Sequence, residues 1–181
     1  TGKSNHDEEG RTLMDYNRAG VPLIEIVTKP DINSPQEARE FVETLASTLR
    51  FLEVSDCIMA QGSMRCDVNI NMVDLDTDNK TKISEIKNIN SIKAIEQALA
   101  FEEKRHKDLL ANNETGIKET RRWDDEKLET IHMRHKEEGN DYRFSADGDI
   151  PKIYLSEEFV NEIEKNLPEL PTVKQKRYIK E

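Results

Sequence analysis

Hydrophobic and polar residues alternate strictly along residues 62–72, GSMRCDVNINM, which is the pattern of a β-strand with two unlike faces. The apolar positions of this predicted strand share one face: Met64, Cys66, Val68, Ile70 and Met72. Its polar positions share the other: Arg65, Asp67, Asn69 and Asn71. A polar sheet face either meets water or lines a site, and the alternation alone leaves both interpretations open.

Further strands are predicted around this one. Residues 21–28, VPLIEIVT, have the β-branched content of a strand. Residues 82–88, KISEIKN, alternate again and follow a polar turn, so we expect an antiparallel hairpin with residues 62–72. Residues 118–124 and 129–136 flank another polar turn, which predicts a second hairpin.

Two amphipathic helices are predicted between these strands. Ser34, Pro35 and Glu37 supply an N-cap, a first-turn proline and a capping-box partner for the first helix. Its apolar positions predict one face buried against a sheet: Ala38, Phe41, Val42, Leu45, Leu49 and Leu52. Ser91 can cap the second helix, which is expected to bury Ile92, Ile95, Leu99, Leu109 and Leu110.

The carboxy-terminal part reads as a loop followed by short helices. Residues 140–151 are expected to form an irregular loop, and a small helix is expected from Ser156 to about Asn166. Thr172 and Gln175 have capping-box spacing and predict the start of another helix. Because strands and helices do not alternate regularly, we expect an α+β fold with a mainly antiparallel sheet and packed helices.

Composition narrows the function classes. The formal net charge of -10 argues against nonspecific coating of nucleic acid, so we expect DNA not to be a partner. No apolar run approaches the roughly 18 residues of a membrane span, so no membrane association is expected. Cys57 and Cys66 are too few for a disulfide framework and are expected to be buried thiols.

The strand predicted over residues 82–88 could add charged groups to this polar face. Glu85 and Lys87 lie two residues apart and therefore point the same way. If the two polar faces coincide, Asp67 and Glu85 offer hard oxygen ligands for Mg²⁺, while Arg65 and Lys87 offer charge to phosphates. The alternative is a simple cross-strand charge pair. The sequence contains no Walker loop, glycine-rich kinase loop or dinucleotide fingerprint.

Two other groups of residues suggest binding. Arg121 and Trp123 could form a platform for an unstacked base, although Trp123 anchoring the second hairpin is the favoured interpretation. His132 and His135 could suggest a metal pair. Because a spacing of three puts strand residues on opposite faces, we expect no zinc site there.

Longer motifs carry a family resemblance. The segments MDYNRAGVPLIEIV, SPQEAREFVETLASTLRFLEVSD, GSMRCDVNI, EIKNINS, ETRRWD, MRHKEEGNDYR and LPELP occur in that order. In order and spacing they resemble the B-subunit family of glutamyl/aspartyl-tRNA amidotransferases, over nearly all of the chain. A likeness of this length implies a fragment of such a protein.

The resemblance implies a reaction and partners. A member of this family uses ATP and Mg²⁺ to activate misacylated Glu-tRNA(Gln) or Asp-tRNA(Asn) as an acyl phosphate. Ammonia from a partner amidase, the A-subunit, then displaces the phosphate, and a small C-subunit is the third member of the complex. A cytoplasmic location, or an organelle matrix in a eukaryote, is the corresponding expectation.

The resemblance also implies a fold. Residues 1–166 would be the carboxy-terminal part of a cradle-shaped catalytic domain related to the glutamine synthetase fold, and residues 167–181 a linker and the start of a helical domain. Further acidic ligands of the family would lie before Thr1, so this piece alone is expected to be inactive. The alternative is a non-catalytic scaffold that docks the amidase and the small third partner.

Site residues follow from the same likeness. It implies that Glu85 is a metal ligand, which Asp67 could join, and that Arg65, Lys87 and Asn88 lie near ATP or the acyl phosphate. Arg65 and Lys87 are accordingly the expected catalytic residues. The family usually has two glutamates where this chain has Ala60 and Gln61, which removes charge just before the polar strand.

Overall fold

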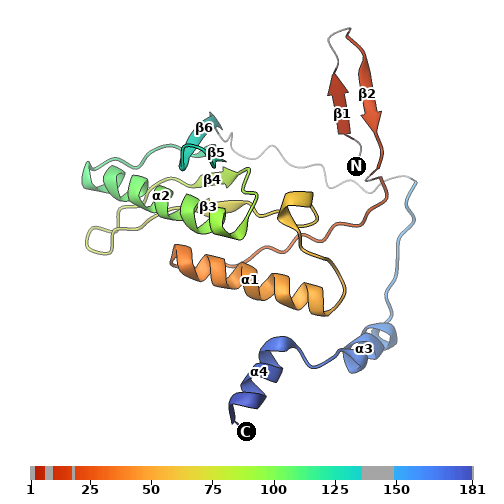
Figure 1. The fold of residues 1–181 in the computed structure, drawn as a ribbon. Helices are drawn as coiled ribbons and strands as arrows, with labels where there is room; N and C mark the ends of the chain where they lie inside the picture. The colour runs from red at the N-terminus through yellow and green to blue at the C-terminus, as the bar shows by residue number, and fades with distance from the viewer. Residues whose placement is uncertain (1–2, 7–9, 18, 136–148, 181) are drawn as a thin grey trace. The chain divides into compact units, whose positions relative to one another are not determined.

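The computed structural model describes residues 3–6, 10–17, 19–135 and 149–180, which cluster into two compact units, residues 1–31 and 32–181 (Figure 1). The first unit contains an antiparallel hairpin of β1 (Lys3–His6) and β2 (Thr12–Asp15). The strand predicted over residues 21–28 is wrong. Its β-branched residues are exposed, and no strand among the described residues pairs with it, so its backbone lacks the hydrogen-bonded ladder that a strand requires.

The second unit is built on a four-stranded sheet in the order β3-β4-β5-β6. These strands are Val68–Ile70, Ser84–Lys87, Glu119–Asp124 and Glu129–His135. The pairs β3-β4 and β5-β6 are antiparallel, so both predicted hairpins and the α+β class are confirmed. Strand β3 is shorter than the alternating segment 62–72, because regular pairing with β4 covers only residues 68–70.

The two hairpins are joined by a parallel pairing of β4 with β5. Helix α2 (Ile92–Ala111) connects these strands. It returns the chain to the end of the sheet at which β4 begins, as a parallel connection requires. Ser91 caps α2 as predicted, because its Oγ accepts a 3.1 Å hydrogen bond from the Ala94 amide. The sheet is therefore mixed at its centre.

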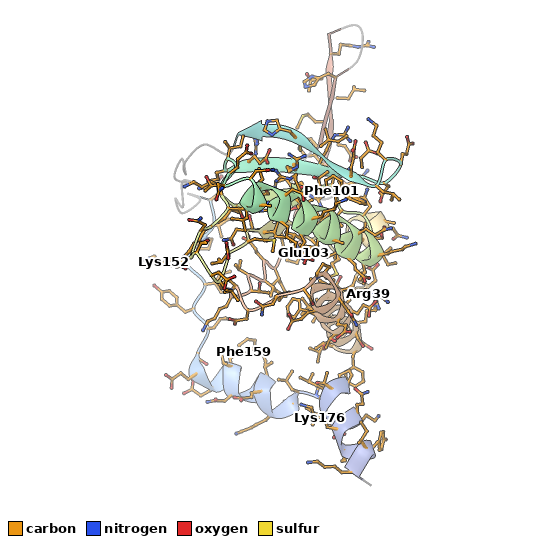
Figure 2. All side chains as sticks on the ribbon, turned by 90° about the vertical axis from the view of Figure 1, so that its left-hand side faces the viewer. Arg39, Phe101, Glu103, Lys152, Phe159 and Lys176 are labelled. Atoms are coloured by element: carbon orange, nitrogen blue, oxygen red, sulfur yellow. The ribbon has the colours of Figure 1, made fainter. Side chains whose placement is uncertain are left out.

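Helix α1 (Pro35–Phe51) begins where the sequence predicts. Ser34 Oγ accepts from the Glu37 amide at 3.1 Å, whereas the Glu37 carboxylate accepts from the amide of Asn33 rather than of Ser34. The main partner of α1 is α2 rather than the expected sheet, because α2 itself packs against β3 and β6. Arg39, labelled in Figure 2, joins the two helices through a 3.1 Å ion pair with Glu96.

The core lies between the helices and one face of the sheet. Buried apolar side chains from α1, the sheet and α2 form one cluster: Ala38, Val42, Ile86, Ile89, Ala94, Ile95, Ala98, Leu99 and Trp123. Trp123 is only 1% exposed and donates from Nε1 to Asp125 Oδ1 at 2.7 Å. The hairpin-anchor interpretation of Trp123 is confirmed, and the base-platform alternative is wrong because its ring is buried.

A single 3₁₀ turn, η1 (Met59–Gln61), precedes β3. It ends at Gly62, whose φ of 74° is a left-handed conformation that glycine adopts without steric cost. Ala60 and Gln61 therefore lie in this turn rather than in the strand. Of the two cysteines, Cys57 is buried as expected and Cys66 is half-buried, and neither is in a disulfide.

Two short helices follow the sheet. Helix α3 (Glu157–Asn166) confirms the predicted small helix, and Ser156 caps it, but its apolar residues remain about half exposed. Helix α4 (Pro171–Lys180) starts ahead of Thr172, so the predicted cap at Thr172 is wrong: Pro171 occupies the first helical position. The loop predicted over residues 140–151 lies mostly outside the described residues.

No helix in the described part of the chain combines the length and apolarity needed to cross a bilayer. The domain boundary expected near residue 166 stays a prediction.

Candidate functional site

The site residues lie on the sheet face opposite α2, which we call the outer face. In β4, Ser84 Oγ contacts side chains of α2 and Ile86 is buried in the core, so the alternate residues Glu85 and Lys87 point away from the helix. Strand register then aligns one outer-face row across all four strands: Asn69, Glu85, Thr120 and Arg134. A second row contains Lys87, Arg122 and Ile131.

Lys87 connects the two predicted metal-ligand carboxylates. Its Nζ lies 2.7 Å from Asp67 Oδ2 and 3.6 Å from Glu85 Oε1. The hydrogen bond to Asp67 raises the pKa of Lys87, and the negative charges of Asp67 and Glu85 add to this effect against a smaller opposing contribution from partial burial. Three of the five predicted residues are therefore brought together, with Lys87 held as a cation.

Glu85 has a further partner that the sequence did not indicate. Thr120 Oγ1 donates to Glu85 Oε2 at 2.9 Å, and the Thr120 side chain is fully buried although it belongs to the polar outer face. Arg121 and Trp123, for which the sequence suggested binding, lie on the opposite face of this strand. The alternation of ETRRWD marks two faces, but it cannot say which one lies beside Glu85.

The remaining two predicted residues are placed less closely. Arg65 precedes β3, is exposed, and its side chain makes no hydrogen bond or ion pair with the other described residues. Asn88 follows β4 with a left-handed φ of 62°, and its Nδ2 donates to the Trp123 carbonyl at 3.1 Å. This bond ties the end of β4 to β5. A role for either residue in binding ATP stays a prediction.

The donor set on the outer face fits Mg²⁺ better than zinc. Magnesium in proteins is commonly held by one or two carboxylates together with phosphates and waters, and Asp67 and Glu85 supply two such groups. Within the described ranges, no group of three or more His, Cys, Asp and Glu side chains could hold a metal ion by itself. Any ion bound here would therefore need oxygen ligands from a substrate, water or other parts of the protein.

The simple alternation assumed for residues 132–135 does not hold in β6. The register of β5 with β6 shifts between Thr120 and Arg121, so residues of β6 do not alternate regularly across this point. His132 pairs instead with a carboxylate of the neighbouring strand, with Nδ1 2.6 Å from Glu119 Oε2.

The opposite sheet face carries charged groups of a different kind, which we call the buried ion network. It comprises Ser84, Glu102, Arg105, His106, Glu119, Arg121 and Thr130. Glu102 of α2 is fully buried and lies 2.7 Å from Arg105 and 3.1 Å from Arg121. Burial raises the pKa of Glu102, but hydrogen bonds from His106, Arg105 and Thr130 outweigh burial and lower it to about 2.

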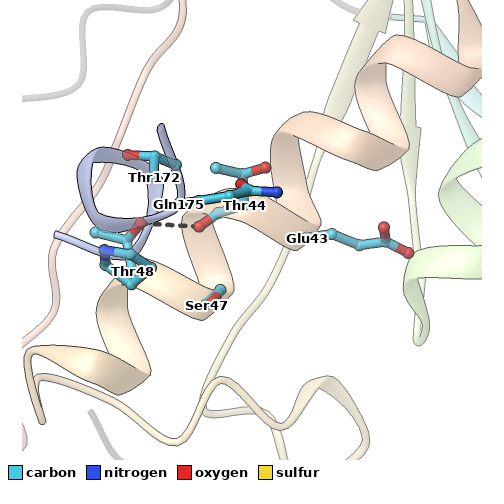
Figure 3. Close-up of a pocket in the computed structure, with 7 residues that line it drawn as sticks. Glu43, Thr44, Ser47, Thr48, Thr172 and Gln175 are labelled. Atoms are coloured by element: carbon cyan, nitrogen blue, oxygen red, sulfur yellow. Dashed lines mark hydrogen bonds between the residues drawn. The ribbon is translucent and has the colours of Figure 1, made fainter. Parts of the chain in front are cut away.

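A shallow hollow lies between α1 and α4 (Figure 3). Hydroxyl and amide side chains line most of it, including Thr44, Ser47, Thr172 and Gln175, and Glu43 is its charged member. The Thr48 hydroxyl is already used by a 2.9 Å hydrogen bond to the Thr44 carbonyl. None of the predicted site residues lines this hollow, so the candidate site is the outer face.

Comparison with known proteins supports the family resemblance. Residues 1–161 match the family described as the GatB/GatE catalytic domain. The chain is 61% identical over all its 181 residues to the B-subunit of the aspartyl/glutamyl-tRNA(Asn/Gln) amidotransferase of Finegoldia magna, of which it covers 38%. It is 49% identical over 180 residues to the protein of the same name from Clostridium botulinum strain Loch Maree, covering 99% of this chain and 38% of that relative.

The chain thus spans little more than a third of the length of these relatives, as expected for a fragment. The family match covers the hairpin of the first unit, the whole four-stranded sheet and both helices that pack with it. It also contains every residue of the outer-face site. This chain belongs to the GatB/GatE catalytic domain family.

Proposed function

We propose that this chain is part of the ATP-dependent activating subunit of a tRNA-dependent amidotransferase. In the proposed reaction, the side-chain carboxylate of Glu-tRNA(Gln) or Asp-tRNA(Asn) attacks the terminal phosphorus of ATP, and ADP leaves. Ammonia then attacks the acyl carbon of the resulting acyl phosphate, and phosphate leaves. The proposal includes an amidase, the A-subunit, as the source of ammonia and a small C-subunit as third partner.

The observation that carries the proposal is the cluster of Asp67, Lys87 and Glu85 on one sheet face. Phosphoryl transfer depends mainly on positioned charge around oxygen atoms and needs little covalent help from the protein. Opposite charges held close together on paired strands supply such positioning.

Each residue of the cluster has a proposed task. Glu85 and Asp67 would hold Mg²⁺, which when bound neutralises negative charge on phosphate oxygens. The Lys87 ammonium would donate to a phosphate oxygen, and Asp67 keeps it protonated and directed along the outer face. Arg65 has an exposed side chain that could reach the same phosphates.

The test uses the full-length protein in complex with its partners, because the chain covers only part of its relatives. We expect Glu85→Gln to lower ATP-dependent formation of amidated tRNA by about a hundredfold or more while the complex still assembles. The matched control is Glu103→Gln, which removes a carboxylate from the exposed Glu103–Lys107 pair on α2. Wild-type transfer by an assembled Glu85→Gln complex would overturn the proposal.

A second candidate function is partner docking without catalysis. Three apolar residues of α3, Phe159, Val160 and Ile163, are each about half exposed, which suits a surface that packs against another chain or domain. The two functions separate in one experiment: Glu85→Gln should leave a docking scaffold unaffected, whereas Phe159→Asp should weaken complex assembly.

A further inference from the structure

We propose that the Thr120 hydroxyl is the positioning group for the Glu85 carboxylate, and that it sets the metal affinity of the outer face. This inference rests on the proposed function, in which Glu85 holds Mg²⁺. Carboxylates that bind metals are usually themselves hydrogen-bonded, and loss of such a partner commonly weakens metal affinity roughly ten- to a hundredfold.

The geometry makes Thr120 a fixed donor. Its Oγ1 lies 2.9 Å from Glu85 Oε2, and the two residues are direct register partners in the parallel pair β4-β5. Thr120 is fully buried, and a β-branched side chain has few rotamers, so its hydroxyl is held in one direction. Glu85 retains 14% exposure of its side chain, so part of the anchored side chain remains open to solvent.

The two oxygens of Glu85 have donors of unequal strength. Oε2 accepts the Thr120 hydrogen bond, whereas Oε1 lies 3.6 Å from Lys87 Nζ, beyond an ordinary hydrogen bond. Lys87 is directed mainly to Asp67, at 2.7 Å. Of these two donors, Thr120 therefore orients Glu85, and Lys87 stays available to move toward a phosphate.

The opposite face of β5 holds Thr120 in place. Its neighbour Glu119 lies 3.0 Å from Arg105 of α2, and its neighbour Arg121 lies 3.1 Å from Glu102 of the same helix. Thr120 is thus flanked by two residues that α2 holds through buried ion pairs. Strand β5 consequently presents the hydroxyl to Glu85 from a position whose two neighbours are tied to α2, as a positioning residue requires.

The test compares Thr120→Val, which keeps shape and removes the hydroxyl, with Thr120→Ser, which keeps the hydroxyl. Mn²⁺ binding to the assembled full-length complex with ATP is measured by electron paramagnetic resonance, together with the Mg²⁺ concentration that gives half-maximal transfer. We expect Thr120→Val to weaken Mn²⁺ binding about tenfold and to raise the Mg²⁺ requirement similarly. Thr120→Ser should remain close to wild type in both measurements.

Glu85→Gln, measured in parallel, separates the inference from the proposal beneath it. If Glu85→Gln loses Mn²⁺ binding and Thr120→Val does not, the role of Thr120 is overturned and the proposed function stands. If Glu85→Gln binds Mn²⁺ and transfers phosphate like wild type, the proposed function is overturned, and the inference about Thr120 is overturned with it. Adding Thr120→Val to Glu85→Gln should cause no further loss, because the hydroxyl acts through Glu85.

Assembly and thermal melting of each variant show whether the complex is intact. If Thr120→Val does not assemble, Thr120→Ala removes the same hydroxyl with a smaller side chain and takes its place in the comparison. Weakened Mn²⁺ binding by an assembled Thr120→Ser complex would also overturn the inference, since that variant retains the donor.

Discussion

Glu102 Oε1 lies 3.1 Å from Arg121 Nε, so helix α2 and strand β5 are joined by an ion pair whose carboxylate is fully buried. Burying a carboxylate is unfavourable unless hydrogen bonds and opposite charges compensate it. Arg105 and Thr130 also bond the Glu102 carboxylate. The stability of this unit therefore depends on the charge state of one glutamate.

Acid should destabilise the chain through Glu102. Because its pKa is lowered from 4.5 to about 2, its stabilising contribution is complete above pH 4.5 and is lost as the pH falls toward 2. At about 1.4 kcal/mol for each pKa unit, protonation of Glu102 should lower the free energy of unfolding by roughly 3 kcal/mol. Urea unfolding at about pH 6 and about pH 2.5 measures this loss, and Glu102→Gln should show a smaller loss over the same interval. Equal losses in both proteins would contradict the prediction.

Asp67→Asn should lower the pKa of Lys87, because it removes the nearest negative charge and weakens the hydrogen bond that the carboxylate accepts. The raised pKa of Lys87 stabilises the fold at neutral pH, and that contribution is lost only as the pH rises through a value above 10.5. Since both side chains are partly exposed, the free energy of unfolding should fall by less than about 1 kcal/mol. NMR titration of the Lys87 side chain measures the change, with Asp76→Asn in the exposed turn as control. An unchanged Lys87 pKa in Asp67→Asn would refute it.

Trp123→Ala should lower the free energy of unfolding by about 3–5 kcal/mol, because it empties the largest fully buried side-chain position. Trp123→Phe should cost less, since it keeps an aromatic ring and loses the bond to Asp125. Urea unfolding followed by circular dichroism measures both. The control is Leu75→Ala, at a residue 93% exposed, which should change stability by less than about 0.5 kcal/mol. A loss at Trp123 as small as that at Leu75 would place the indole outside the core.

Cys66 should react slowly with alkylating reagents. Burial raises the pKa of its thiol to about 11, with a smaller contribution from the charge of Asp67, so little of it is thiolate at about pH 8. In a Cys57→Ser background, iodoacetamide should modify the folded chain about a hundredfold more slowly than the urea-unfolded chain. Similar rates in the two states would show that Cys66 is not shielded.

The parts of the fold that sequence predicts are local. Ser34 and Ser91 cap their helices because a capping side chain acts on an amide three residues away. Period-two alternation also predicted that Asp67, Glu85 and Lys87 share a face on the condition that the two strands pair with their polar sides together.

The parts that sequence missed depend on distant contacts. Thr120 meets Glu85 only through a parallel pairing across the whole of α2, which alternation within either strand cannot reveal. Helical periodicity does mark Glu102, because with Ile95, Leu99 and His106 it lies on the stripe of α2 that faces the core. The strand predicted over residues 21–28 is wrong because β-branched content favours an extended backbone but does not supply a partner strand.

The parallel pairing of β4 with β5 has a consequence for the order of folding. Each hairpin closes a short loop, whereas Glu85 and Thr120 stand 35 residues apart, and such long-range contacts form slowly. We therefore expect both hairpins and α2 to form before strands β4 and β5 pair. Glu85 belongs to the first hairpin, and its hydroxyl donor Thr120 belongs to the second. A chain arrested just short of the native state would hold nearly all of its secondary structure and the cluster of Asp67, Lys87 and Glu85, but it would lack the Thr120 hydrogen bond to Glu85.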